Sequence, residues 1–381
     1  MTRIYLVAGE ASGDVLGARL IEALRRQRDD LEFIGIGGAR MAEQGLASLF
    51  PMQDLAVMGL AEILPRVMKL RQRLAQAVAD VSARKPDILI TIDSPGFTLR
   101  LLRAVAPLGI RRVHYVAPQV WAWRQGRVKH FPGLWDRLLC LLPFEPAFFQ
   151  PFGLNPVFVG HPVLQSGADR GDALRFRTVF GLDGGARPLI LMPGSRRTET
   201  ARLMPVFRET VALLTARHPA LVPVLAAAPA IASELGAMAA GWPIRPIIVT
   251  DPETRYDAFA AAAAALTKSG TSTLELALAG VPMAVTYRVN PLSALFARRL
   301  IKVPHVAMIN LLARHALVPE LLQQECNPEL LARTIATLLD NPVAAAEQRA
   351  GFAAALATLQ APAGALPADA AARAIIETLS A

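Results

Sequence analysis

The chain has 381 residues, a length that fits two domains, and its 53% hydrophobic and 19% charged residues exclude global disorder. Its two cysteines, Cys140 and Cys326, have neither a C-x-x-C nor a metal-ligand spacing, which argues against a disulfide scaffold or a cysteine-based zinc site and fits a cytoplasmic setting. With 40 Lys and Arg against 31 Asp and Glu, the net charge of +9 favours an anionic partner: phosphates, nucleic acid or an anionic lipid surface.

Short apolar segments alternate with amphipathic helical segments along most of the chain. In the first half the expected strands are residues 4–8, 32–35, 87–92 and 112–116, with a helix over 14–27. The pattern pauses near residues 160–163 and restarts with expected strands at 188–192, 221–226, 247–250 and 284–286. This rhythm predicts an α/β protein with two facing Rossmann-like domains on parallel sheets, residues 1–165 and 166–344, with helices in 345–381 returning to the first.

The first expected strand ends in a turn of small residues, Gly9-Glu10-Ala11-Ser12-Gly13-Asp14, that opens a helix. Free backbone N–H groups at such a turn suit an anionic ligand, and the alternative is that Ser12 or Asp14 caps the helix. The later run Gly35-Ile36-Gly37-Gly38 follows the second strand and lacks the acidic partner of a dinucleotide fingerprint. We therefore interpret that run as a turn.

Asp93 directly follows the expected strand at 87–92 and precedes Ser94-Pro95, where a helix begins. A carboxylate at this edge of a sheet is well placed for a general base, because burial can tune its pKa. An Asp in front of a Pro is also a common helix cap. The sequence alone leaves both roles open.

Two segments combine hydrophobic and basic residues. Between residues 111 and 137, Arg and Lys are interleaved with Trp121, Trp123 and Trp135, which fits either a lipid-headgroup interface or an internal role of the tryptophans, and no nucleic-acid motif accompanies them. Residues 57–73 predict a basic amphipathic helix that faces either a bilayer interface or the protein core. The membrane-facing candidates are Val57, Met58, Leu60, Ile63, Leu64, Arg66, Val67, Met68 and Lys69.

Two loops in the second half have the residues of a phosphate site. Pro193-Gly194-Ser195-Arg196 places a fixed positive charge beside a turn and a helix start, a combination that can hold a diphosphate. After Lys268, the run Ser269-Gly270-Thr271-Ser272-Thr273-Leu274-Glu275 carries a carboxylate that can accept both hydroxyls of a ribose. The alternative for this second loop is ordinary helix capping, with Glu275 as a solvated first-turn charge.

Five motifs in this chain resemble those of the lipid-A-disaccharide synthase family, glycosyltransferase family 19 of the two-lobed GT-B class. They are V-A-G-E-A-S-G-D at 7–14, V-A-P-Q-V-W-A-W at 116–123, V-G-H-P at 159–162, P-G-S-R at 193–196 and S-G-T-S-T-L-E at 269–275. The resemblance runs to about residue 330. It implies an inverting transfer from UDP-2,3-diacylglucosamine to the 6-hydroxyl of 2,3-diacylglucosamine 1-phosphate, which yields a β-1,6-linked lipid A precursor and UDP.

The resemblance also assigns roles to particular residues. Asp93 matches the catalytic base, with Glu10 and Arg196 as further catalytic positions, and the acceptor-side loop matches Ser12, Gly13, Asp14 and Gln119. The donor site matches Gly194, Ser195, Arg196, Ser269, Gly270, Thr271, Thr273, Glu275, Asn310 and Gln323. No metal or other cofactor is expected, since Arg196, helped by Lys268, takes the place of a cation. The chain departs from the family pattern at Gly96 and Thr98, where the family often has Asp and Asn.

The implied partners are the two acylated glucosamine substrates and an anionic membrane surface, with no nucleic acid. The resemblance places the protein in the cytoplasm, peripherally bound at the inner face of the bacterial inner membrane, and allows a homodimer with exchanged C-terminal segments. Two alternatives stay open: an enzyme like UDP-N-acetylglucosamine 2-epimerase, and a non-catalytic nucleotide- or lipid-binding protein.

Overall fold

The computed structural model describes residues 1–55, 63–227, 231–290 and 302–380. The chain forms two compact units. Unit 1 comprises Met1–Pro162 and Leu359–Ala381, and unit 2 comprises Val163–Thr358. The chain therefore leaves unit 1 after Pro162 and returns to it at Leu359.

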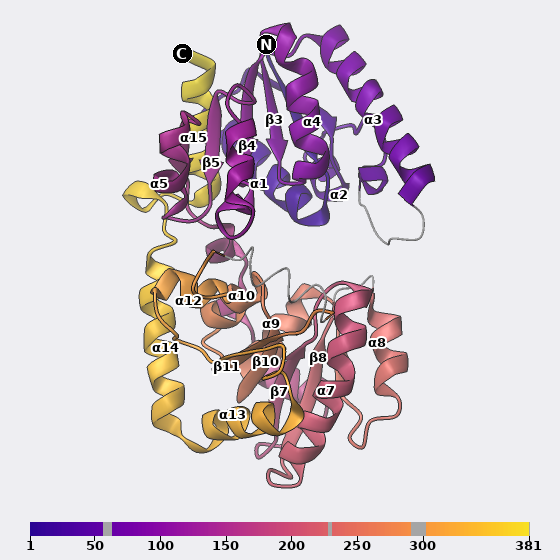
Figure 1. Ribbon diagram of the computed structural model, residues 1–381, viewed down its shortest axis with the longest axis vertical. Helices are drawn as coiled ribbons and strands as arrows, with labels where there is room; N and C mark the ends of the chain where they lie inside the picture. Colours follow the sequence, from indigo (N-terminus) through magenta and orange to yellow (C-terminus); the bar gives the residue numbers. More distant parts are fainter. Residues whose placement is uncertain (56–62, 228–230, 291–301, 381) are drawn as a thin grey trace. The chain divides into compact units, whose positions relative to one another are not determined.

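Unit 1 is built on a parallel sheet of six strands in the order β2-β1-β3-β4-β5-β6 (Figure 1). The strands are β1 (Thr2–Ala8), β2 (Leu31–Ile36), β3 (Ile88–Ile92), β4 (Arg111–Tyr115), β5 (Arg137–Cys140) and β6 (Pro156–Phe158). All five residues of β3 are buried, the continuous apolar run expected of a strand covered on both faces. The helices are α1 (Ala11–Gln27), α2 (Ala39–Glu43), α3 (Ile63–Arg84), α4 (Pro95–Val105), α5 (Glu145–Phe149) and α15 (Pro367–Ser380).

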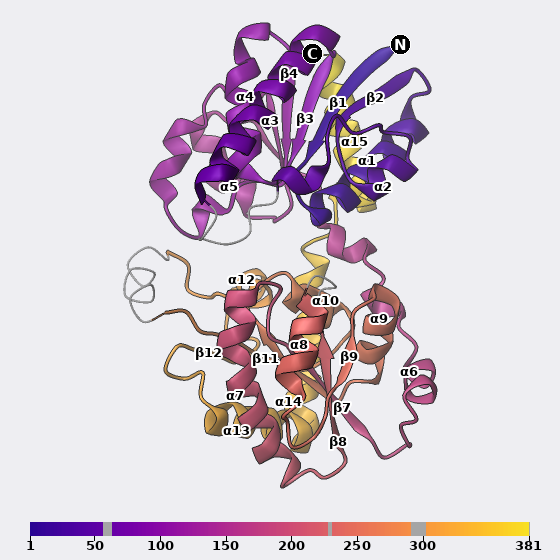
Figure 2. The same cartoon turned by 90° about the vertical axis from the view of Figure 1, so that its right-hand side faces the viewer.

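Helices cover both faces of the unit 1 sheet. α1 and α15 lie side by side on one face, and α3 and α4 lie on the other (Figures 1 and 2). Small buried residues such as Ala371 and Ala372 let α15 approach the sheet closely, and its Asp369 pairs with Arg26 of α1. The C-terminal helix is therefore part of the core of unit 1.

Unit 2 repeats this plan with the strand order β12-β11-β10-β7-β8-β9, again all parallel. Its strands are β7 (Arg187–Met192), β8 (Leu221–Ala226), β9 (Ile247–Val249), β10 (Ala264–Lys268), β11 (Met283–Tyr287) and β12 (Glu320–Leu322). Its helices are α6 (Ala173–Val179), α7 (Arg197–Thr215), α8 (Ala232–Ala239), α9 (Pro252–Ala261), α10 (Ser272–Leu278), α12 (Met308–Ala313), α13 (Pro328–Asp340) and α14 (Pro342–Ala357). The predicted parallel α/β architecture is confirmed in both units.

The limits of the units differ from the predicted domain limits at two places. Residues 163–165 lie in unit 2, and so does α14, which the sequence grouped with the returning helices. Gln348 explains the place of α14, because its side chain accepts a hydrogen bond from the Met283 N–H at 2.8 Å and donates one to the Met283 carbonyl at 3.2 Å. Of the two C-terminal helices, α14 thus belongs to unit 2 and α15 to unit 1.

Each sheet has one point where the strand order reverses direction. In unit 1 this point lies between β1 and β3, and in unit 2 it lies between β7 and β10. Ligands of doubly wound sheets bind beyond the carboxyl ends of the strands at such a switch point. The loops that follow these four strands are therefore the places to look for a site.

Candidate active site

In unit 1 the loops after β1 and β3 meet at the switch point. A side chain at Gly9 would place its Cβ 2.5 Å from Ser94 Oγ, so the two loops pack this closely only because residue 9 has none. Glu10 and Asp93, both predicted as catalytic, thus follow neighbouring strands at the same edge of the sheet.

The backbone at Asp93 is strained. Asp93 and Ser94 have φ angles of 50° and 48°, in the left-handed region that residues with a side chain seldom occupy. The Asp93 N–H donates to the Tyr115 carbonyl at 2.9 Å, and the Thr98 hydroxyl donates to the Asp93 carbonyl at 2.7 Å. Strain that neighbouring groups hold in place is typical of functional sites. Thr98 therefore serves to fix this turn.

The environment of the Asp93 carboxyl suits proton transfer. Burial raises the pKa of Asp93, and a hydrogen bond from the Ser94 N–H lowers it in part. A base with a raised pKa holds a transferred proton more firmly than an ordinary carboxylate. The capping alternative is not supported, because the N-cap residue of α4 is Ser94, whose side chain makes no capping hydrogen bond within the described part of the chain.

Asp14 has a structural place that the sequence did not indicate. Its buried carboxylate accepts hydrogen bonds from the backbone N–H groups of Gly38, Arg40 and Met41 at 2.8, 2.9 and 3.1 Å. It therefore caps the start of α2, not that of its own helix. Ser12, in contrast, is exposed, and Gly13 packs against β3.

We expect Asp14→Ala to lower the free energy of unfolding by about 3 kcal/mol, because three backbone N–H groups lose their acceptor. Urea denaturation measures this change. The matched variant Ser12→Ala removes an exposed hydroxyl and should stay within about 0.5 kcal/mol of the unmodified protein. Equal stability of the two variants would contradict the capping role of Asp14.

The three tryptophans between residues 111 and 137 do not form one surface. Trp121 and Trp135 are buried, and their indole N–H groups donate to Glu145 Oε1 at 3.0 Å and to the Leu154 carbonyl at 3.1 Å. Trp121 and Trp135 therefore have an internal structural role. Trp123 is exposed beside Arg124, and Gln119, at the start of the short helix η3 (Gln119–Trp121), is exposed as well.

Glu145 is a buried carboxyl that the sequence reasoning missed. Besides the Trp121 indole, the backbone N–H groups of Leu141 and Leu142 donate to it, each at 3.0 Å. Burial nevertheless outweighs these hydrogen bonds and raises the pKa of Glu145 to about 7. Its proton is therefore lost near neutral pH.

This pKa predicts a pH dependence of stability. Between about pH 4.5 and 7 the folded protein keeps the Glu145 proton while the unfolded chain releases it, so stability falls as the pH rises through this range. The difference between the ordinary pKa of 4.5 and the pKa of about 7 in the folded protein corresponds to about 3 kcal/mol of stability. We expect Glu145→Gln to remove this slope in urea denaturation, whereas Glu377→Gln, at an exposed position, should keep it. An unchanged slope in Glu145→Gln would contradict the assignment.

In unit 2 the loops after β7 and β10 also meet at the switch point. The buried carboxylate of Glu199, in the first turn of α7, links them: its Oε1 lies 3.0 Å from Lys268 Nζ and 3.7 Å from Arg196 Nη1. Gly194, with a φ of 118°, lies above it, and a Cβ there would be 2.6 Å from Glu199 Oε2. The two loops predicted to hold a diphosphate are thus brought together, with Arg196 largely exposed.

The remaining loop residues divide into exposed and internal ones. Ser195 and Thr271 are exposed. Ser269 donates to the Val306 carbonyl at 2.7 Å, and the buried Thr273 hydroxyl donates to the Gly270 carbonyl at 2.8 Å. These two hydroxyls shape the loop in this structure.

Asn310 and Gln323, predicted near the nucleotide, also make internal contacts. Asn310 is fully buried, and its amide exchanges hydrogen bonds with both backbone groups of Val318 and donates to Glu320 Oε1 at 2.8 Å. Gln323 Oε1 accepts a hydrogen bond from the Val289 N–H at 3.3 Å. We assign Asn310 a structural role that joins α12 to β12.

Glu275 lies one turn into α10, as predicted, and contacts two residues of α9 that the sequence did not single out. Its Oε1 accepts a hydrogen bond from the Tyr256 hydroxyl at 3.1 Å and one from Arg255 Nη2 at 3.4 Å. Among the described residues, no group of three or more His, Cys, Asp or Glu side chains is placed to hold a metal ion. The expectation of a metal-free site stays a prediction.

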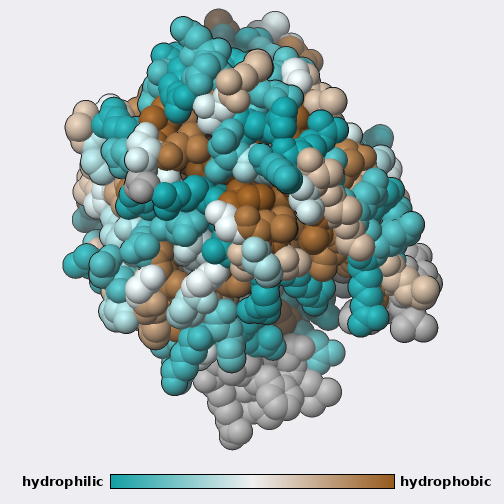
Figure 3. Space-filling view, turned by 90° about the horizontal axis from the view of Figure 1, so that it is seen from above, coloured by the Kyte–Doolittle hydropathy of each residue, from teal (hydrophilic) through white to brown (hydrophobic). Residues whose placement is uncertain are grey.

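The membrane-facing candidates lie in part outside the described residues: this applies to Val57, Met58 and Leu60 and to the side chains of Ile63, Leu64 and Arg66. On α3, Val67 and Met68 are exposed, the latter to 69%, while Lys69 pairs with Asp54 at 2.5 Å. The surface seen from above in Figure 3 combines hydrophilic areas with smaller hydrophobic ones. None of the helices in the described ranges is long and apolar enough to cross a membrane.

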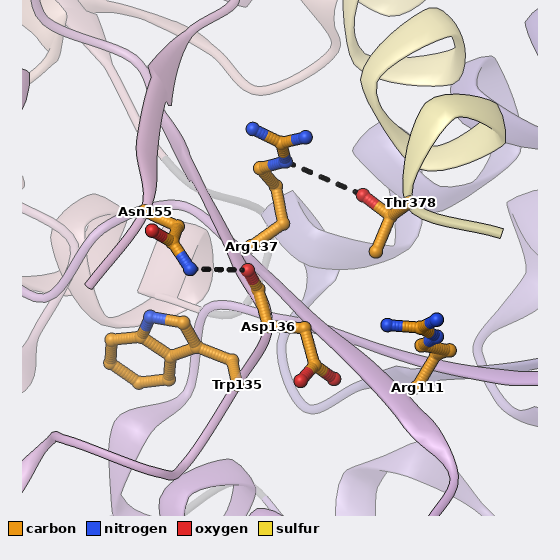
Figure 4. A pocket seen from close by; sticks show the side chains of 6 residues that line it. All are labelled: Arg111, Trp135, Asp136, Arg137, Asn155 and Thr378. Carbon is orange, nitrogen blue, oxygen red and sulfur yellow. Dashed lines mark hydrogen bonds between the residues drawn. The ribbon is translucent and has the colours of Figure 1, made fainter. Parts of the chain in front are cut away.

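A cavity of about 420 Å³ lies at the other edge of the unit 1 sheet, at the starts of β4 and β5 (Figure 4). It is lined by Arg111, Trp135, Asp136, Arg137, Asn155 and Thr378. None of these residues was predicted for the site, and Asp93 follows the opposite end of its strand. This cavity is therefore separate from the candidate active site.

Comparisons of the sequence with known proteins point to one family. Residues 4–372 match the family model of lipid-A-disaccharide synthetase. The chain is 59% identical to the lipid-A-disaccharide synthase of Gluconobacter oxydans, over 99% of this chain and 91% of that protein. It is 57% identical to that of Granulibacter bethesdensis, over 99% and 98%, and 43% identical to that of Pseudomonas aeruginosa, over 89% and 90%.

Two solved structures share the fold at low sequence identity. The UDP-GlcNAc 2-epimerase of Neisseria meningitidis, solved with UDP-GlcNAc, has a TM-score of 0.67 at 12% identity and covers 100% of both chains. The glycosyltransferase of kitacinnamycin has a TM-score of 0.63 at 18% identity and covers 99% of this chain and 98% of its own. These likenesses confirm the predicted GT-B class, whereas the sequence relatives decide the family. The chain belongs to the lipid-A-disaccharide synthase family of glycosyltransferases.

Proposed function

We propose that this protein transfers the sugar of UDP-2,3-diacylglucosamine to the 6-hydroxyl of 2,3-diacylglucosamine 1-phosphate, and so forms the β-1,6-linked lipid A disaccharide and UDP. Membership of the family supports the reaction. The observation that carries the proposal is the place of four loops at the two switch points: three with family motifs, after β1, β7 and β10, and the loop after β3, which begins with Asp93. The epimerase alternative has the fold in its favour but not the sequence relatives.

Unit 2 would bind the UDP part of the donor. Arg196 and Lys268 provide positive charge beside the first N–H groups of α7, a helix of 19 residues whose N-terminus favours an anion. As the bond to the sugar breaks, negative charge grows on the diphosphate, and fixed donors stabilise it without rearrangement. Glu275 would accept hydrogen bonds from the ribose hydroxyls.

Unit 1 would supply the base. Asp93 accepts the proton of the acceptor 6-hydroxyl while that oxygen attacks the anomeric carbon of the donor, and the bond to the UDP oxygen breaks with its electron pair. A single displacement of this kind inverts the configuration at the anomeric carbon. Glu10, which follows the neighbouring strand, would act beside Asp93.

Both substrates carry acyl chains, so we infer that the protein works at a membrane surface, at the inner face of the bacterial inner membrane. The exposed Val67 and Met68 of α3 support this place. In this structure α15 packs on unit 1 of its own chain. A homodimer with exchanged C-terminal segments stays a prediction.

The test is to incubate the purified protein with both acylated substrates and a chelator, and to follow UDP and disaccharide by mass spectrometry. We expect the two products in equal amounts. Epimerised sugar in the absence of acceptor would favour the epimerase alternative. UDP binding without any product would favour the non-catalytic one.

A further inference from the structure

Two side chains contact the carboxylate proposed to bind ribose, and both contacts are made to the same oxygen. Tyr256 and Arg255 both reach Oε1 of Glu275, at 3.1 and 3.4 Å. Neither of these two contacts involves Oε2. Each carboxylate oxygen can accept further hydrogen bonds, so this arrangement leaves acceptor capacity for a ligand.

The two residues that hold Glu275 also contact each other. The Arg255 guanidinium lies over the Tyr256 ring, 5.2 Å from its centre, and donates to the Tyr256 hydroxyl at 3.4 Å. Burial raises the pKa of Tyr256, so its hydroxyl keeps its proton and can donate at any physiological pH. The pair therefore fixes the rotation of the Glu275 side chain.

Helix α9, which carries this pair, is anchored at both sides. Asp251 caps its start by accepting a hydrogen bond from the Thr254 N–H at 2.8 Å. The buried Asp257 pairs with Arg175 of α6 and accepts a hydrogen bond from the Asp172 N–H at 2.7 Å. Tyr256 and Arg255 thus extend from a rigid support toward Glu275 on the neighbouring helix.

We propose that Tyr256 and Arg255 are positioning residues that hold Glu275 in the orientation in which it accepts the ribose hydroxyls of the nucleotide. This inference rests on the proposed function, which places ribose at Glu275. Hydrogen bonds between a carboxylate and hydroxyls depend strongly on direction. A Glu275 side chain free to rotate would therefore bind the nucleotide more weakly.

Calorimetric titration of the full-length protein with UDP and with 2′,3′-dideoxy-UDP tests this inference. We expect Tyr256→Phe to weaken UDP binding by about five- to tenfold, the usual net effect of one hydrogen bond. The same variant should bind dideoxy-UDP as the unmodified protein does, because that ligand has no ribose hydroxyls. In a Glu275→Gln background, Tyr256→Phe should have no further effect on UDP binding.

The control Tyr5→Phe removes a buried hydroxyl from unit 1 and should leave both affinities unchanged. An equal loss for UDP and dideoxy-UDP in Tyr256→Phe would show a merely structural role and overturn the inference, as would no loss at all. Equal binding of the two ligands by the unmodified protein would show that Glu275 does not bind the ribose hydroxyls, and would also overturn the inference. If the unmodified protein binds neither ligand, the proposed function itself fails.

Discussion

Asp93→Asn is expected to lower kcat by about 10²- to 10⁴-fold, the usual contribution of a positioned general base. The amide keeps the size of the side chain but cannot accept the proton of the acceptor hydroxyl. UDP affinity should stay unchanged, because the residues proposed to bind UDP all lie in unit 2, whereas Asp93 lies in unit 1. Steady-state kinetics with both substrates and a separate UDP titration measure the two quantities.

Asp169→Asn is a matched control, since it removes an exposed carboxylate and should retain the unmodified rate. The pH profile gives a second check. A base must be deprotonated, and burial raises the pKa of Asp93, so kcat should rise with pH through a value above that of an ordinary carboxyl. A fully active Asp93→Asn protein would remove this residue from the mechanism.

Arg196→Gln is expected to lower kcat/KM by about 10²- to 10³-fold, the usual cost of removing one donor that stabilises charge in the transition state. Its guanidinium lies beside the loop after β7 and is 74% exposed, available to a diphosphate. The effect should appear in kcat as well as in KM, because the charge on the diphosphate increases as the sugar departs.

Arg197→Gln is the matched control for Arg196→Gln, since it removes the same charge one residue later. Arg197 pairs with Glu234 of α8 at 3.2 Å, so we expect a change of less than about fivefold. Equal losses in the two variants would mean that net charge, and not the position of Arg196, governs donor binding.

The sequence predicted best those parts of the site that depend on local signals. Turns of small residues directly after β1, β7 and β10, and a carboxylate directly after β3, can be recognised within a few residues. Since parallel strands end at the same edge of a sheet, the pairing of these loops follows once the strands are correct. The five motifs then gave the family.

Contacts between distant residues were not predicted. The sequence indicated that Asp14 could cap a helix. It could not indicate that this helix is α2, which begins 25 positions later, because only tertiary packing brings α1 and α2 together. Tyr256 and Glu275 likewise lie on different helices, α9 and α10, and only the tertiary fold brings their side chains together. Glu199 could have been found from the sequence, since it lies only three residues after the motif that ends at Arg196, but its burial beneath Gly194 depends on the fold.

Composition could not decide the role of segments in which hydrophobic and polar features coincide. Trp121 and Trp135 lie among basic residues, yet both indoles are buried and find acceptors inside unit 1. The C-terminal Ala-rich segment was read as one block, whereas α14 packs in unit 2 and α15 in unit 1. In both cases burial, which sequence patterns indicate weakly for Trp and Ala, decides the outcome.

The central claim is a direct displacement in which the acceptor hydroxyl, activated by Asp93, replaces UDP on the donor sugar. The anomeric configuration of the disaccharide, measured by NMR spectroscopy on the product of the purified protein, tests it most directly. We expect a β-1,6 linkage formed with inversion from an α-linked donor, with one UDP released per disaccharide. An α-linked product would contradict it.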